Sequence, residues 1–384
     1  MIRVALQMLL GDRAKFIGIL IGVTFVSLLI TQQAAIFDGL IARSHGAIDD
    51  VGAADLWVMD PKVQQIDDYK PVTDTTLTRV RSVSGVAWAM PYLRTQIKAR
   101  MPDGTQQSCV VIGVDDTTLV GVPPIMKEGR AEDLRRAEGV VVEAREAVNK
   151  LATPLPDGSK RPLAIGDTLE LNDHRRVVVG LAEPSRTFMW FPMVYTTYSR
   201  AVEMAPPERR NLTYVLVKVA EGENRQVVAD RIAATTGMTA LTQEQFRQRT
   251  IDFIMTSTGI PINFRISMAL GFLVGCAIAG QTFFNFVHDN LRHLGALKAM
   301  GARNRQLVMM ILAQAGLAGV IGYGFGVGMA ALFGQAVKGT ELAFLLSGDR
   351  LISSGIAVLA VVLISSALAM RSVIKLEPAV VFRS

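Results

Sequence analysis

The chain has 384 residues, of which 50% are apolar, and its mean hydropathy of +0.33 is higher than that of most water-soluble globular proteins. Its formal net charge is +6, but residues 38–262 carry 27 Lys and Arg against 29 Asp and Glu, so the positive excess lies in short segments beside apolar runs. A role beside the membrane explains this distribution better than a nucleic-acid groove does, so we predict a membrane protein with no nucleic-acid partner.

The first 37 residues predict a cytoplasmic segment followed by a membrane span. Residues 1–15 form an amphipathic segment that carries Arg3, Arg13 and Lys15, and residues 16–37 are uncharged. At 1.5 Å per residue, a helix of that length crosses the roughly 30 Å hydrocarbon layer. A secretory signal peptide is the alternative, but the run is long for one and no small-x-small cleavage site follows it. We therefore predict a retained helix.

Residues 38–262 predict a mixed α/β domain outside the membrane, with room for its own core and for two subdomains. Runs of β-branched and apolar residues, several set off by Asp-Gly or Pro turns, predict strands at 54–59, 108–114, 139–144, 167–171, 175–181, 193–198 and 213–219. Apolar residues at helical spacing predict helices at 143–151, 223–236 and 241–256.

Two aromatic stretches of this domain have two interpretations. Trp88 lies in AWAMPYL (87–93), and Trp190 and Phe191 lie in FMWFPMVY (188–195). Aromatic side chains at strand ends usually pack into a core, which is the interpretation we favour. The alternative is an apolar contact for a lipid-like substrate or a partner, because Met and aromatic side chains suit adaptable binding surfaces.

The segment TGIPIN, residues 258–263, connects the last predicted helix of this domain to the membrane. Gly259 and Pro261 are residue types that interrupt helices, so we predict a hinge at this segment.

Three further uncharged runs of bilayer length, 266–287, 307–334 and 351–370, predict membrane spans, and we assign the first of these spans to residues 263–287. The loop 288–306 and the tail 371–384 are basic, whereas the loop 335–350 is neutral. Because Lys and Arg accumulate on the cytoplasmic side, we predict that both termini and the loop 288–306 are cytoplasmic, and that 38–262 is extracytoplasmic.

Small residues one helical turn apart predict close packing of the second and third spans. The two stripes consist of Gly271 and Gly275, and of Ala318, Gly322 and Gly326. They serve either packing within the chain, which we favour, or contact with a second copy. Since four helices enclose no pore of their own, we expect a dimer.

The sequence lacks the motifs of the catalytic sites that we sought. It has no Gly-Lys dipeptide and therefore no Walker A phosphate loop, and it has no Gly-x-Ser-x-Gly elbow. Its four histidines have no Cys or carboxylate partner at a metal-ligand spacing, and Cys109 and Cys276 lie in settings too different for a disulfide. We predict a chain that is not an enzyme and holds no metal or cofactor.

The stretch LRHLGALKAMGARNRQL, residues 291–307, resembles the intracellular loop of the MacB/FtsX-type (type VII, mechanotransmission) ABC transporter permeases, and looks closest to the DevC-type export permeases. The residues that match the family pattern are Arg292, Leu294, Gly295, Lys298, Ala299, Gly301 and Ala302. His293 departs from it at a position where an acidic residue is common. The C-terminal IKLEPAVVFR, residues 374–383, also resembles the tail of that family.

The resemblance implies four transmembrane helices with a MacB-like periplasmic core domain between the first two. Such permeases form dimers of like or unlike copies in the bacterial inner membrane. They bind two copies of a separate ATPase, which holds the ATP and Mg, on the cytoplasmic face, and transmit its dimerisation stroke to the periplasmic domain. Export types take substrate from the periplasm or outer leaflet with an adaptor and an outer-membrane channel. Lipoprotein release of the LolC/LolE type and FtsX-like signalling to a cell-wall hydrolase share this architecture and stay open.

The same stretch predicts a short helix that couples to the ATPase, made of Leu291, Arg292, His293, Leu294, Gly295, Leu297, Lys298, Ala299 and Gly301. Leucines at helical spacing, continued by Met300, form an apolar edge that could fit a groove of the partner. Gly295 and Ala299 would allow close approach, and Gly301 can end the helix. An amphipathic helix resting on anionic lipid is the alternative.

Overall fold

The computed structural model describes residues 1–101, 103–206 and 212–374. The chain divides into two compact units, one made of Met1–Leu40 and Gly259–Ser384 and the other of Ile41–Thr258. Most of the C-terminal stretch that resembles the family tail lies outside the described residues. Four long apolar helices, one N-terminal and three C-terminal, with a mixed α/β domain between the first two, confirm the predicted fold class.

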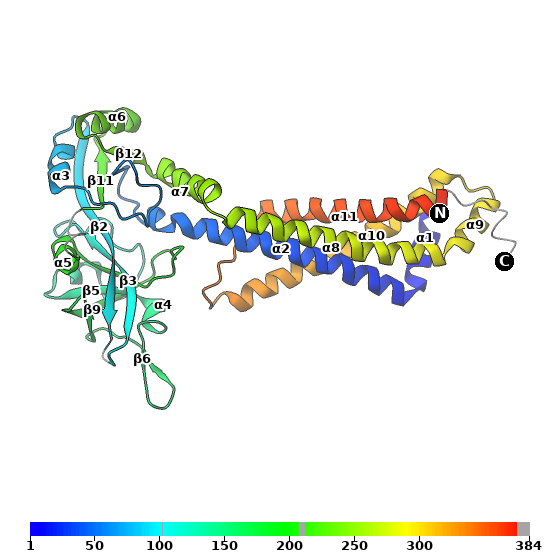
Figure 1. Ribbon diagram of the computed structural model, residues 1–384, viewed down its shortest axis with the longest axis horizontal. Coiled ribbons are helices and arrows are strands. Elements are labelled where there is room, and N and C mark those ends of the chain that lie inside the picture. The colour runs from blue at the N-terminus through cyan, green and yellow to red at the C-terminus, as the bar shows by residue number, and fades with distance from the viewer. Residues whose placement is uncertain (102, 207–211, 375–384) are drawn as a thin grey trace. The chain divides into compact units, whose positions relative to one another are not determined.

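The membrane unit is entirely helical (Figure 1). Its helices are α1 (Ile2–Gly11), α2 (Arg13–Asp49), α8 (Ile260–Asp289), α9 (Leu291–Ala299), α10 (Asn304–Val337) and α11 (Gly348–Ile374). The long ones, α2, α8, α10 and α11, have the length and composition to cross a membrane. Helix α2 continues 12 residues beyond the uncharged run that ends at residue 37, because polar residues can extend a helix in water after the apolar span has ended.

Three hydrogen bonds between side chains and neighbouring helices connect the membrane unit, where no water competes for polar groups. The buried Gln314 on α10 donates its side-chain Nε2 to the carbonyl of Ala5 at 2.8 Å. Tyr323 donates its hydroxyl to the carbonyl of Leu351 at 2.7 Å. Arg350, at the start of α11, donates to the carboxylate of Asp38 on α2 at 2.7 Å. These bonds join α1 to α10, α10 to α11 and α2 to α11.

The outer unit combines a ten-stranded sheet with short helices and a small hairpin. Its strands are β1 (Leu56–Met59), β2 (Val86–Arg100), β3 (Gln106–Val114), β4 (Met126–Glu128), β5 (Gly139–Glu143), β6 (Thr153–Pro154), β7 (Lys160–Arg161), β8 (Thr168–Leu171), β9 (His174–Ala182), β10 (Met193–Thr197), β11 (Tyr214–Val219) and β12 (Thr239–Thr242). Its helices are α3 (Asp74–Arg81), the 3-10 turn η1 (Ala131–Arg135), α4 (Ala144–Ala147), α5 (Tyr198–Met204), α6 (Arg225–Thr236) and α7 (Gln243–Ser257).

The long strand β2 belongs to two parts of the sheet. The order of strands is β12-β1-β11-β2-β3-β10-β5-β9-β4, and β8 pairs with β2 and β9. Residues 86–92 of β2 pair with β11, and residues 93–100 pair with β3. Most neighbours are antiparallel, but β3 with β10 and β5 with β9 are parallel. One continuous strand therefore connects both halves of the outer unit.

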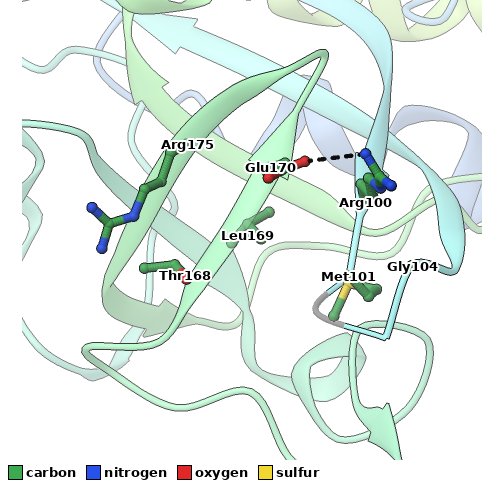
Figure 2. Close-up of a pocket in the computed structure, with 7 residues that line it drawn as sticks. All are labelled: Arg100, Met101, Gly104, Thr168, Leu169, Glu170 and Arg175. Atoms are coloured by element: carbon green, nitrogen blue, oxygen red, sulfur yellow. Dashed lines mark ion pairs between the residues drawn. The ribbon is translucent and has the colours of Figure 1, made fainter.

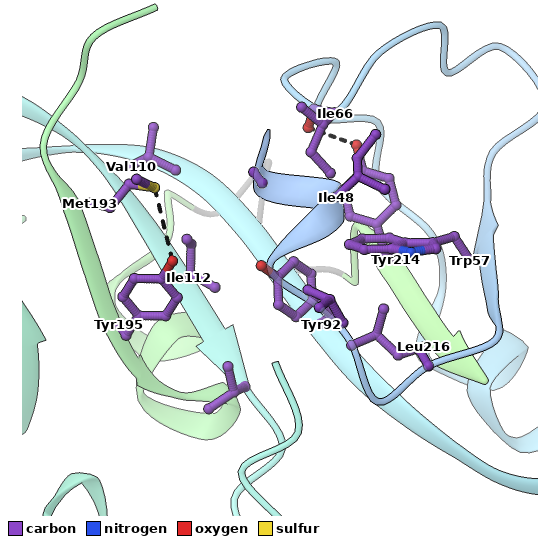
Figure 3. Close-up of a cluster of buried hydrophobic side chains, with 14 of the residues drawn as sticks. Ile48, Trp57, Ile66, Tyr92, Val110, Ile112, Met193, Tyr195, Tyr214 and Leu216 are labelled. Atoms are coloured by element: carbon purple, nitrogen blue, oxygen red, sulfur yellow. Dashed lines mark hydrogen bonds between the residues drawn. The ribbon is translucent and has the colours of Figure 1, made fainter. Parts of the chain in front are cut away.

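An aromatic cluster fills the core where β1, β2, β11 and α7 meet (Figure 3). The fully buried Trp57 lies 5.6 Å from the Tyr92 ring and 5.5 Å from the Tyr214 ring, both edge-on. Phe246 of α7 lies 5.6 Å from the same indole. Edge-to-face pairs add about 0.5–1.5 kcal/mol each beyond the buried area, so this cluster is a main source of stability for this half.

Candidate functional site

The predicted coupling segment forms a helix with a well-defined end. Helix α9 spans Leu291–Ala299, and Gly301 follows it with φ +99°. The N–H of Ala302 donates to the carbonyl of Leu297 at 3.0 Å, and the N–H of Gly301 donates to the carbonyl of Lys298 at 3.1 Å. These are the two bonds of a Schellman motif, in which a glycine takes the left-handed conformation that other residues disfavour. Gly301 therefore ends α9 and directs the chain into α10.

The apolar edge of α9 packs inside the membrane unit. Leu294 is 3% exposed, Gly295 is buried, and Leu291 and Leu297 pack against the membrane core. The side chain of Leu294 is therefore not available to a groove of a partner, because it is buried in the bundle of its own chain. Leu291 and Leu297 are only half-buried, and for them the groove stays a prediction. Of the edge, only Met300 stays open, at 76% exposure.

The opposite side of this segment is exposed and basic. We call Arg292, His293, Met300, Arg303 and Arg305 the coupling surface, and all five are exposed. Ala299 and Gly301 are exposed between them, whereas Lys298 is half-buried. Arg303 is the N-cap residue of α10, and its backbone N–H donates to the Oε1 atom of Gln306 at 2.9 Å. The surface thus presents cationic side chains and one flexible apolar side chain on a fixed turn.

Ion pairs connect the end of α8, from which α9 continues, to the start of α2. The Nζ atom of Lys15, at the start of α2, lies 2.8 Å from the carboxylate of Asp12 and 2.8 Å from that of Asp289, at the end of α8. Hydrogen bonding from Lys15 lowers the pKa of Asp12 below its ordinary value. Asn290 then donates its side-chain amide to the carbonyl of Phe286 at 2.9 Å, where α8 ends and α9 begins. The orientation of α9 is therefore held from its first residue.

The small-residue stripes face helix α2 of the same chain. A Cβ atom on Gly275 would collide with the Val26 side chain, and one on Gly322 would lie 2.7 Å from the side chain of Val23. A Cβ on Gly326 would meet Ser27, and one on Gly271 would be in ordinary contact with Leu29. Ala318 of the same stripe is 1% exposed. The glycines let α8 and α10 approach the backbone of α2 within one copy.

The predicted hinge lies at the boundary between the two units, between Thr258 and Gly259. Thr258 is extended, with φ −118° and ψ 156°, and it is the residue at which α7 ends. Gly259 has φ −75°, a value that any residue can adopt, and Pro261 lies in the first turn of α8, where proline fits a helix. The helices are interrupted at Thr258 and Gly259, within the predicted segment, and Pro261 helps α8 to begin; the hinge itself stays a prediction.

The three aromatic residues singled out in the outer unit have different environments. Trp88 and Phe191 are half-buried and pack against the aromatic core. Trp190 is 43% exposed and has φ +54°, and its carbonyl accepts a hydrogen bond from the Nζ atom of Lys150 at 2.6 Å. Its neighbour Met189 is 51% exposed. Trp190 and Met189 are therefore the apolar side chains of this loop that a partner could reach.

Sequence reasoning missed a junction where α2 meets α7. Arg247 of α7 donates to the Oδ1 atom of Asp49 at 2.6 Å, and Gln243 donates to the carbonyl of Ile48 at 3.2 Å. The Oδ2 atom of Asp49 also lies 2.7 Å from the Nδ1 atom of His45. A carboxylate at a helix C-terminus opposes the helix dipole, and Arg247 offsets that cost. No local pattern reveals the contact, because its two residues are 198 positions apart.

A second junction ties the same end of α2 to the loop before β10. The carboxylate of Asp50 accepts from the Ser185 N–H at 2.7 Å and from the Ser185 hydroxyl at 2.6 Å. Burial raises the pKa of Asp50 above its ordinary value, although these bonds oppose the shift. The C-terminal end of α2 and the residue after it are thereby bonded to α7 and to the loop between β9 and β10.

One polar pocket of the outer unit is lined partly by an ion pair. It has a volume of about 420 Å³ and is lined by Arg100, Met101, Gly104, Thr168, Leu169, Glu170 and Arg175 (Figure 2). Arg100 pairs with Glu170 at 3.9 Å, and Arg175 points away from that pair. Among the residues that the structure describes, no three His, Cys, Asp or Glu side chains are grouped as metal ligands.

Comparisons with known proteins agree with this architecture. The model of the MacB-like periplasmic core domain matches residues 16–235, and that of the FtsX-like permease C-terminal domain matches residues 265–378. No curated protein matches the chain in sequence.

Three solved structures are similar to about half of the chain, at low scores. The extracellular domain of the noncanonic ABC-type transporter YknZ from Gram-positive bacteria is 11% identical, with coverage of 49% of this chain and 99% of that one and a TM-score of 0.35. The periplasmic region of MacB from Actinobacillus actinomycetemcomitans is 13% identical, with coverage of 55% and 97% and a TM-score of 0.37. A domain of a putative permease from Porphyromonas gingivalis is 12% identical, with coverage of 50% and 89% and a TM-score of 0.32.

The two family models together span both units and cover most of the chain. This protein is a multi-pass membrane protein that belongs to the MacB/FtsX-type ABC transporter permeases.

Proposed function

We propose that this permease couples a separate ABC ATPase, bound at the coupling surface, to movements of its outer domain that drive export. The observation that carries the proposal is the exposure of the coupling surface on α9, on the turn after it and at the start of α10, while the other face of α9 packs against the bundle. A surface that served only the fold of this chain would not need three exposed arginines around one exposed methionine.

The orientation of the chain supports this assignment. The basic flanks of the first span, of α9 and of the last span lie on one side of a four-span topology, and that side is the cytoplasm by the positive-inside rule. The outer unit then lies in the periplasm, and both termini are cytoplasmic. The coupling surface is accordingly on the side of the membrane where ATP is available.

The chemistry of the coupling surface indicates what its partner presents. Arginine forms bidentate bonds with carboxylates, and a methionine side chain adapts to an apolar pocket. The partner surface should therefore combine acidic side chains with a shallow apolar pocket. Two copies of such an ATPase, with ATP and Mg bound between them, would serve a pair of permeases.

Two observations favour export by mechanical transmission. The apolar runs 16–37, 266–287, 307–334 and 351–370 contain no Asp, Glu, Lys, Arg or His. The spans therefore lack the ionisable side chains that an ion-coupled carrier uses. The end of α2 is bonded to α7 through Arg247 and to the loop before β10 through Ser185, so a displacement of that helix end would act on both halves of the outer unit. The exposed Met189 and Trp190 offer a contact for an adaptor or for substrate.

The test is to reverse two charges of the coupling surface and measure how much ATPase co-purifies with the permease. Arg292→Glu with Arg303→Glu should lower the ATPase-to-permease ratio, because two unfavourable charge contacts cost about 2 kcal/mol, or about 30-fold in affinity. The matched control is Arg265→Glu, which alters an exposed arginine at the other end of α8.

An unchanged ratio in the double variant, with normal membrane insertion, would contradict the proposal. If the surface rests on anionic lipid instead, the double variant loses affinity for phosphatidylglycerol vesicles and keeps its ATPase. The control variant should behave as wild type in both assays.

A further inference from the structure

Helix α8 carries a second exposed face that the four-helix bundle does not use. The side of α8 that faces the bundle consists of Gly271, Gly275, Ala279, Gly280, Phe283, Phe286 and Val287, all buried. Of the residues that the structure describes, none covers the opposite side, where Leu270 is 56% exposed and Val274 is 45% exposed. Exposed apolar residues are normal on a membrane helix, so exposure alone does not identify an interface.

The spacing of the exposed residues on α8 is that of a helix-packing seam. Among the exposed residues of α8, which also include Leu273 and Ile278, six lie at intervals of four, three, four, three and four residues, namely Leu270, Val274, Ala277, Gln281, Phe284 and His288. This 3.5-residue repeat keeps one line of side chains facing a second helix in left-handed packing. The last two positions are already ordered, since the rings of Phe284 and His288 stack at 5.9 Å.

One residue of this seam, Gln281, has an amide side chain within the hydrocarbon layer. The charge-free part of α8 lies between Arg265 and Asp289, about 36 Å along the helix, which only slightly exceeds the roughly 30 Å hydrocarbon layer. Gln281 is eight residues before Asp289, so in a helix along the membrane normal it lies at least about 6 Å inside that layer. A polar side chain at that depth is costly unless it is hydrogen-bonded.

The hydrogen bonds within the chain leave this amide partly unsatisfied. The Nε2 atom of Gln281 donates to the Oδ1 atom of Asn285 at 3.1 Å, and among the described residues this is the one side-chain bond that either amide makes. Gln281 keeps its carbonyl oxygen and one N–H, and Asn285 keeps both amide hydrogens. The pair thus has both a free acceptor and free donors on the exposed side of α8.

We infer that this face of α8 binds the α8 helix of a second copy of the chain, with the two Gln281 amides hydrogen-bonded to each other across a two-fold axis. Copies in one membrane share an orientation, so their α8 helices run parallel and each seam position meets its own counterpart. An amide is self-complementary, because its N–H donates while its C=O accepts. Ala277, one turn away, is small enough for the two backbones to approach. The inference rests on the proposed pairing of two permeases and assigns the surface that forms the pair.

Disulfide cross-linking of the full-length protein in membranes tests the assignment. In a background with Cys109→Ser and Cys276→Ser, Ala277→Cys should form a covalent dimer on oxidation, since a disulfide requires Cβ atoms about 4 Å apart. The matched control is Val320→Cys, which is 73% exposed on α10 at a similar distance from the helix ends, and it should stay monomeric. If Val320→Cys cross-links and Ala277→Cys does not, the two copies pair but not through α8, and the proposed interface is wrong.

A second measurement separates the seam from the pairing. Replacing Gln281 with Leu should weaken self-association in lipid vesicles roughly 3- to 30-fold by energy transfer between labelled copies, and Gln281→Asn should retain part of it. Unchanged association of Gln281→Leu overturns the role of the amide. If native mass spectrometry shows one permease copy and Ala277→Cys does not cross-link, both the seam and the proposed pairing are wrong. Two copies without a cross-link overturn the seam alone.

Discussion

The buried carboxylate of Glu143 should make the outer domain less stable as the pH rises from about 4.5 to about 7. Glu143 ends β5 and is 7% exposed, and one of its oxygens accepts the N–H of Met193 at 3.3 Å. Burial, reinforced by the nearby Glu146 carboxylate, raises the pKa of Glu143 from 4.5 to about 7. Arg145 and Lys150 lower it, but their effects are smaller.

The direction of this pH dependence follows from the protons that Glu143 binds in the folded and the unfolded chain. Between pH 4.5 and 7 the folded domain holds a proton on Glu143 that the unfolded chain has released, so the free energy of unfolding falls as the pH rises. The difference between 4.5 and about 7 corresponds to a loss of about 3 kcal/mol in the free energy of unfolding. Glu143→Gln keeps the shape and an acceptor for Met193 but carries no charge, so it should stabilise the domain by up to about 3 kcal/mol at pH 8 and have no effect near pH 4.

Tryptophan fluorescence of the full-length protein can measure this effect, because Trp57, Trp88 and Trp190 are its only tryptophans and all lie in the outer domain. For a domain of this size, about 3 kcal/mol corresponds to a rise in Tm of about 6–12 °C at pH 8. Glu132→Gln, at an exposed position, is the control and should not change the Tm. A Tm of Glu143→Gln equal to that of wild type at pH 8 would refute the reasoning.

Two glycine pairs give further predictions. Gly326→Ala should destabilise the membrane unit by about 1–3 kcal/mol, because its Cβ would meet Ser27 and lie 2.8 Å from the backbone nitrogen of Leu28. Gly328→Ala, which has no atom within 4 Å of its Cβ, should be tolerated; equal heat-induced aggregation of the two variants in detergent would argue against the packing. Gly301→Ala should cost about 1–2 kcal/mol because of its φ of +99° and should speed hydrogen exchange at the end of α9. Gly259→Ala should leave exchange and function unchanged, because alanine can adopt the φ of −75° at this position, and a loss of function would mean that motion at Gly259 needs a glycine.

Most of the architecture could be predicted because it depends on local patterns. Uncharged runs predict the four spans, and all seven predicted strands are present within one or two residues. The predicted helix at 143–151 contains only α4, at Ala144–Ala147, because its polar residues then form turns. Strand β2 was missed beyond its aromatic start, since Pro91 and the mixed residues after it lack a clean alternation.

The position of the coupling helix could be predicted from the sequence, but the face that it buries could not. The sequence indicates a short helix at 291–299 ended by Gly301, and both are present. Which face of the helix is buried depends on the neighbouring helices, and the leucines pack against these, so only the basic side and Met300 stay open. Long-range junctions such as Asp49 with Arg247 leave no local signal at all.

The most direct test of coupling is the reactivity of a cysteine placed at Met300, with and without the ATPase. Cys109 is fully buried, and burial raises the pKa of its thiol to about 12, so in a Cys276→Ser background Met300→Cys is the reactive thiol. The account predicts that a membrane-impermeant maleimide labels Met300→Cys only from the cytoplasmic side, and that bound ATPase slows this labelling at least about tenfold. Ile165→Cys, 45% exposed in the outer domain, should label from the opposite side at an unchanged rate. Labelling of Met300→Cys from outside the cell, or at the same rate with and without the ATPase, would contradict the account.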